Sequence, residues 1–206
     1  GALVASGIAV PLEEYVFTPE RWLPYTGFFG RVLGHMFTLG FAAEFLKYAA
    51  FRYTIWPGHV RQRLDGVAYA MAIALGFATV LNLRFALLTE ASLLATALRV
   101  ASYTFSHLAL GVVLGFFLSE LVIGKVPYFW MPVGLGVASL LSGLYYAFHI
   151  VAIVGGLSQV GTGARPIRGV ALGFGFVAVI FIAFAFIIDN ADRRMETVVG
   201  RPGLEL

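Results

Sequence analysis

Ionisable side chains lie inside long apolar runs of this chain. Glu44 and Lys47 stand three residues apart in FTLGFAAEFLKYAAF, and His107 and Arg99 lie in another apolar run. A charged residue at the centre of a bilayer costs about 2.5 to 3.5 kcal/mol on insertion scales, so such groups usually face a bundle interior. Residues three apart share a helix face, so Glu44 and Lys47 can pair. With His107 they form a candidate site shared by two helices.

Further polar residues recur at helical spacing in the other apolar runs. They are Asp65, Asn82, Arg99, Tyr103, Ser142, Tyr146 and His149. Several have a purely structural interpretation. Asp65 is a good helix N-cap, and Arg99 can extend its side chain toward a helix end. His35 and His149 are each interpreted first as hydrogen-bonded packing residues.

Composition assigns the chain to the integral membrane proteins. Its 206 residues are 60% hydrophobic and 12% charged, with a mean hydropathy of +0.88. Globular proteins are roughly 45 to 50% apolar and about 25% charged. The absence of cysteine excludes disulfides, zinc–thiolate sites and thiol nucleophiles. The net charge of +3 includes no dense basic run, so the expected partner is the lipid bilayer and not nucleic acid.

Apolar segments of about 20 residues predict an all-α, polytopic bundle of about six transmembrane helices. They cover about 1 to 17, 31 to 55, 65 to 88, 91 to 120, 128 to 155 and 166 to 189. The joints are short, so we predict one transmembrane domain over 1–189 and a polar tail over 190–206. Because the first residue is not Met, we expect a trimmed or incomplete N-terminus.

Loop charges and glycine pairs add two further expectations. Lysines and arginines lean seven to five toward the side of the tail, which predicts a cytoplasmic C-terminus. Glycines at G-x-x-x-G spacing let helix backbones approach closely, so we expect them to mark helix packing. These pairs are Gly30–Gly34, Gly111–Gly115 and Gly169–Gly173.

The order of AEFLK, DGVAYAMAIALGFATVLN, RVASYTFSH with GVVLG, and LLSGLYY resembles the PrsW family of intramembrane proteases. That family is related to the CAAX-type prenyl endopeptidases. The resemblance covers about residues 30 to 150 and implies a multi-pass protein of the bacterial inner membrane. The family pattern runs E-E-x-x-K, then D-G with G-F-x-x-x-E-N, then an Arg and a His, then a late histidine. It implies that Glu44 and His107 are the catalytic positions if the chain is active.

Three positions depart from that pattern. Ala43 stands at the first glutamate of the E-E pair, Leu81 at the later glutamate, and Ser142 where a histidine is expected. Metal-assisted hydrolysis needs about three protein ligands and a general base. Acid–base hydrolysis needs at least two groups with separated pKa values. Because Glu44 and His107 alone supply neither set, we predict no bound metal and no cofactor.

The leading hypothesis is therefore a non-catalytic PrsW-like scaffold or accessory subunit, assembled with other integral membrane subunits. Its polar core would hold Glu44 through Lys47 or Arg99. His107 would bond to Asn82, Tyr146 or backbone.

Two alternatives stay open. One is an active PrsW-like intramembrane protease that cleaves a membrane-anchored regulator. The other is a haem- or chlorophyll-binding subunit with His35, His107 or His149 as an axial ligand.

Overall fold

The structure is a computed structural model that describes residues 1–55, 57–90, 93–124, 126–152 and 166–199. All regular structure in these ranges is helical, which confirms the predicted all-α class. The α-helices are α1 (Ala2–Val4), α2 (Phe28–His35), α3 (Phe41–Thr54), α4 (Arg63–Leu88), α5 (Leu93–Ile123), α6 (Trp130–Ala152) and α7 (Pro166–Val199). Wider π turns are η1 (Ala5–Ala9), η2 (Leu12–Phe17) and η5 (Met36–Gly40), and short 3₁₀ turns are η3 (Pro19–Arg21) and η4 (Leu23–Tyr25).

Within the described ranges, four helices are long and apolar enough to cross a membrane. They cover Arg63–Leu88, Thr96–Ile123, Trp130–His149 and Gly173–Arg194, in agreement with four of the six predicted spans. The predicted spans 1–17 and 31–55 consist instead of shorter α and π pieces joined end to end. Helix α7 continues to Val199, so the first part of the predicted polar tail is helical. Residues 200–206 of that tail lie outside the described ranges.

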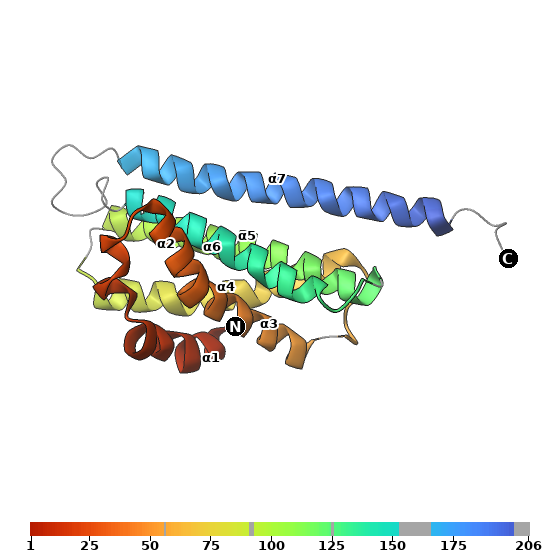
Figure 1. Ribbon diagram of the computed structural model, residues 1–206, viewed down its shortest axis with the longest axis horizontal. Helices are drawn as coiled ribbons and strands as arrows, with labels where there is room; N and C mark the ends of the chain where they lie inside the picture. Colours follow the sequence, from red (N-terminus) through yellow and green to blue (C-terminus); the bar gives the residue numbers. More distant parts are fainter. Residues whose placement is uncertain (56, 91–92, 125, 153–165, 200–206) are drawn as a thin grey trace.

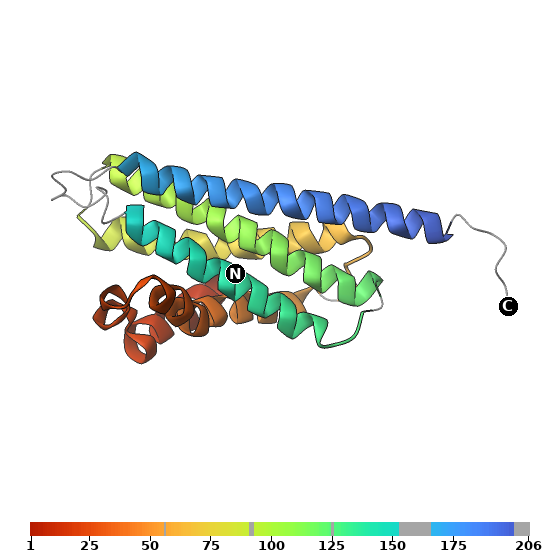
Figure 2. The same ribbon diagram turned by 45° about the horizontal axis from the view of Figure 1, so that its top comes forward.

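Helices α4 to α7 lie side by side, with α7 along one face and the N-terminal segments on the opposite face (Figures 1 and 2). Helix α5 is central, because 78% of its membrane window is buried against 17% of that of α7. Side chains from α4, α5, α6 and α7 meet in one apolar cluster that includes Val67, Val113, Tyr145 and Val177. Helix α5 therefore forms the centre of the bundle.

Close backbone contact joins α4 to α5. A Cβ atom added at Gly115 would lie 2.6 Å from the carbonyl oxygen of Gly66. A Cβ added at Gly111 would lie 3.1 Å from the Cα of Met71. Small residues permit this approach, as expected for the Gly111–Gly115 pair.

Gly115→Ala is expected to lower the free energy of unfolding by about 1 to 3 kcal/mol, because the added methyl meets backbone that cannot rotate away. Gly136→Ala is the matched control, since a Cβ there meets nothing within 4 Å. Alanine is also a better helix former than glycine, by about 1 kcal/mol. Equilibrium unfolding in detergent gives the free energy of unfolding of both variants. Equal stability of the two would contradict the close α4–α5 contact.

Candidate functional site

Glu44 and Lys47 of α3 meet His107 of α5 in the interior of the bundle. The exposed fractions of the three residues are 0%, 1% and 6%. The Lys47 ammonium donates to Glu44 Oε1 at 2.5 Å and lies 3.3 Å from His107 Nδ1. An ammonium group has no acceptor, so Nδ1 of His107 must accept. The inward direction of these residues and the Glu44–Lys47 pair are confirmed.

Aromatic rings enclose this charged cluster. The His107 ring lies 5.5 Å from the Phe77 ring and 4.8 Å, edge-on, from the Tyr103 ring. Lys47 Nζ lies 5.7 Å from the centre of the Phe77 ring. Glu44 Oε2 is buried and has no hydrogen-bond partner among the described residues. The cluster is therefore an apolar-walled ion pair with one unused carboxylate oxygen.

A second polar pair joins α2 to α6. His35 Nε2 lies 3.3 Å from Ser142 Oγ, and the Tyr146 ring stacks on the His35 ring at 4.3 Å. The spacing of Ser142 and Tyr146 predicted a shared face, but it did not pair that face with His35. His149 lies one turn further along α6, where its ring stacks on Tyr145 at 6.0 Å.

Asn82 does not bond to His107, so this part of the predicted polar core is wrong. Its side-chain amide donates instead to Thr104 Oγ1 at 2.9 Å and to the Val100 carbonyl at 3.4 Å. Both acceptors precede His107 on α5, because Asn82 lies near the end of α4, which runs antiparallel to α5. His107 bonds to Lys47, a partner that the spacing of residues did not predict.

Asp65 caps α4, but not as its N-cap residue. Gln62 is the N-cap, and Asp65 lies at the third helical position of a capping box. Asp65 Oδ2 accepts from the backbone N–H groups of Arg61 and Gln62, each at 2.9 Å. The prediction of a structural role holds, and the helix begins earlier than expected.

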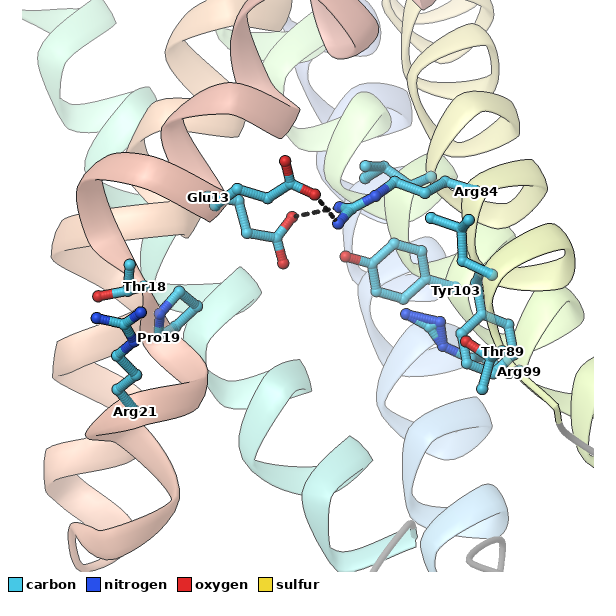
Figure 3. Close-up of a pocket in the computed structure, with 12 residues that line it drawn as sticks. Glu13, Thr18, Pro19, Arg21, Arg84, Thr89, Arg99 and Tyr103 are labelled. Atoms are coloured by element: carbon cyan, nitrogen blue, oxygen red, sulfur yellow. Dashed lines mark hydrogen bonds and ion pairs between the residues drawn. The ribbon is translucent and has the colours of Figure 1, made fainter.

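Arg99 and Tyr103 share the predicted face of α5 with His107. The Arg99 guanidinium lies 3.8 Å from the centre of the Phe85 ring and 5.2 Å from that of Tyr103. Arg99 and Tyr103 also line a cavity of about 400 Å³ that opens beside Glu13 and Arg84 (Figure 3).

Two of the three departures from the family pattern share one apolar environment, and the third lies beside His35. Ala43 and Leu81 both pack against an apolar cluster of Ala5, Leu46 and Phe77. Ser142 presents a hydroxyl to His35. Among the described residues, no three His, Asp or Glu side chains lie close enough together to hold a metal ion.

Sequence reasoning missed two ion-pair groups at opposite ends of α4. Arg63 bonds to Glu120 of α5 and, at 2.6 Å, to Asp192 of α7. Arg84 pairs with Glu14 and lies 3.8 Å from Glu13. Glu120 lies in the apolar run GVVLGFFLSELVIG, so the rule that singled out Glu44 also applied to it. Asp192 offered no such signal, because it lies in a polar segment.

Comparisons with known proteins show the family to which the chain belongs. A family model described as "PrsW family intramembrane metalloprotease" matches residues 1–186. Protease PrsW of Bacillus subtilis (strain 168) is 31% identical over 111 residues, which cover 52% of this chain and 49% of that protein. The chain thus spans about half the length of this relative, and no solved structure matches. The chain is a multi-pass membrane protein that belongs to the PrsW family of bacterial intramembrane metalloproteases.

Proposed function

We propose that this chain keeps the PrsW-type bundle without peptide hydrolysis and serves as a scaffold or accessory subunit among other membrane proteins. One observation carries the proposal. The two positions where the family pattern has glutamates, Ala43 and Leu81, pack against one apolar cluster beside Glu44. Methyl and isobutyl groups can neither bind a metal ion nor move a proton. The hydrolytic centre implied by the family therefore lacks two carboxylates at the place where it would act.

The remaining donor set does not fit a hydrolytic metal ion. Such an ion takes three protein ligands and keeps one position for water. Lys47 places an ammonium between Glu44 and His107, and its positive charge opposes a dication at that point. The Ser142 hydroxyl bonds to His35 and replaces the histidine of the family pattern. No hydrolytic step is assigned to these residues.

The polar contacts have a structural use in this proposal. The Glu44–Lys47–His107 cluster ties α3 to α5, and the His35–Ser142 pair ties α2 to α6. Buried polar pairs fix one arrangement of helices because a shifted helix would leave the groups unpaired. We further infer that segments 1–17 and 28–54 cross the membrane as the first two of six spans. Segment 28–54 is long enough, at roughly 40 Å of continuous helical rise.

An outward apolar surface is available to partner helices. Val179, Ile182 and Phe186 of α7 are each at least 65% exposed. Lipid covers such side chains as readily as protein does, so the scaffold proposal needs a direct test. Gentle extraction of the tagged protein from its native membrane should recover a membrane partner in fixed stoichiometry. A Glu44→Leu variant should recover less partner per chain. Recovery of the wild-type chain alone in every mild detergent would contradict the scaffold role.

The second candidate function is intramembrane proteolysis, and family membership over residues 1–186 favours it. Glu44 Oε2 supports it as well, because this buried oxygen has no partner among the described residues and belongs to the cluster that contains His107. In this hypothesis the chain cleaves a membrane-anchored protein with Glu44 and His107. Loss of cleavage in Glu44→Ala and His107→Ala, with assembly intact, would support it. The haem or chlorophyll hypothesis stays a prediction.

A further inference from the structure

The cavity beside Arg99 lies outside the Glu44–Lys47–His107 cluster. It has a volume of about 400 Å³ and opens where α4 ends and α5 begins (Figure 3). Its walls come from the last turns of α4, the first part of α5, η2 and the residues that follow η2. Because α4, a candidate membrane span, ends there at Leu88, we expect this cavity at the depth where a bilayer changes from hydrocarbon to headgroups.

The charged groups of the cavity are unequally engaged. Arg84 is held by Glu14 and lies near Glu13, so that arginine is neutralised. The guanidinium of Arg99 makes no hydrogen bond or ion pair with a described residue, and its Nη1 is buried without a partner. Its guanidinium instead lies against the rings of Phe85 and Tyr103. These rings hold the planar group in place and leave its donors available to a ligand.

The same wall of the cavity offers further donors. Figure 3 shows Tyr103 and Arg99 next to each other on the side that faces Glu13. Thr89 also lines the cavity, and each hydroxyl can donate one hydrogen bond. A guanidinium and hydroxyl groups match an anion with several oxygens, above all phosphate, which arginine binds through two parallel hydrogen bonds. Basic pockets between membrane helices bind lipid headgroups in the same way.

We propose that this cavity binds a phosphate group, with Arg99 as its main ligand and Tyr103 and Thr89 as further donors. The phosphate belongs either to a phospholipid headgroup or to a soluble phosphate compound. The site is independent of the proposed function, because it uses neither Glu44 nor His107.

Native mass spectrometry in dodecyl maltoside, a detergent without phosphate, tests the lipid source. Wild-type protein is titrated with phosphatidylglycerol and, separately, with a diacylglycerol glucoside that lacks phosphate. Arg99→Gln should bind phosphatidylglycerol about tenfold more weakly than wild type, which corresponds to the loss of one charge-assisted hydrogen-bond pair. The glucoside should show no difference. Arg61→Gln is the charge-matched control. Arg61 is exposed and lies just before the start of α4, at the end of that helix away from the cavity.

Inorganic phosphate, added without lipid, tests the soluble source. An Arg99-dependent rise in the unfolding temperature with phosphate, without preference for phosphatidylglycerol, assigns the site to a soluble phosphate compound. Preference for phosphatidylglycerol that Arg99→Gln removes assigns it to lipid. If Arg99→Gln does not fold, Arg99→Lys and Tyr103→Phe replace it and should weaken binding to a smaller degree. Equal binding of phosphatidylglycerol by all folded variants, with no Arg99-dependent effect of phosphate, would overturn the proposal.

Discussion

Glu44→Leu is expected to destabilise the bundle by about 3 to 5 kcal/mol, because it leaves the ammonium of Lys47 buried without its carboxylate. Lys47 is 1% exposed, so water cannot replace the lost partner. Glu44→Gln keeps an oxygen that can accept from Lys47 and should cost less, about 1 to 2 kcal/mol. The free energy of unfolding in detergent, measured for both variants, gives the comparison.

Glu14→Leu provides the control for removing a glutamate from an ion pair. Glu14 pairs with Arg84, and both side chains are about one-third exposed, at 38% and 31%. Exposed pairs contribute roughly 0 to 1 kcal/mol, so this variant should remain near wild type. The buried-pair account fails if Glu44→Leu unfolds at the wild-type denaturant concentration, or if Leu and Gln at position 44 destabilise equally.

Arg63→Met, at the start of α4, should lower the free energy of unfolding about as much as Glu44→Leu does. Arg63 is 5% exposed and joins Glu120 of α5 to Asp192 of α7. Its removal leaves the Glu120 carboxylate, 11% exposed, without its cation, at a cost of about 3 to 5 kcal/mol. The double variant Arg63→Met with Glu120→Leu should recover much of that loss, since no buried charge is then unpaired.

Arg193→Met is the control for removing an arginine from an ion pair. It tests whether the loss of an exposed arginine of α7 destabilises the protein as much as the loss of Arg63. The Arg193–Asp189 pair is largely exposed, at 75% and 58%, so its loss should change stability by no more than about 1 kcal/mol. Equilibrium unfolding of these three variants and of the wild type gives the free energies to compare. Equal effects of Arg63→Met and Arg193→Met, or no recovery in the double variant, would contradict a buried charge network at this end.

Apolar length and helical spacing were sufficient to predict the fold class and four of the spans. Those criteria detect long apolar helices, and α4 to α7 each contain a long apolar helical stretch. They could not predict that the segment before α4 is divided by π turns, because a π turn depends on one extra residue in a turn and not on hydropathy. The start of α4 was misplaced for a similar reason, since Gln62 is a less common N-cap than Asp65.

Within the site, the contact between neighbours on one helix could be predicted, whereas the contacts between different helices could not. Glu44 and Lys47 are neighbours on one helix, so their spacing alone predicted the pair. The bond between His107 and Lys47, and that between His35 and Ser142, join residues far apart in sequence. Such partners depend on the depth at which two helices cross, which spacing within one helix does not determine. Arg99 was expected to extend toward a helix end, and its contact with Phe85 in a cavity was not predicted.

Peptide hydrolysis within the membrane is the activity that separates the two proposed functions most directly. Membranes from bacterial cells that express wild type or Glu44→Gln at equal levels can be compared by mass spectrometry of protein N-termini. Cells that express Protease PrsW of Bacillus subtilis serve as the positive control. The scaffold proposal predicts that no new N-terminus depends on the wild-type chain. A cleaved membrane protein that appears with wild type and disappears with folded, assembled Glu44→Gln would contradict it and would establish the chain as a protease.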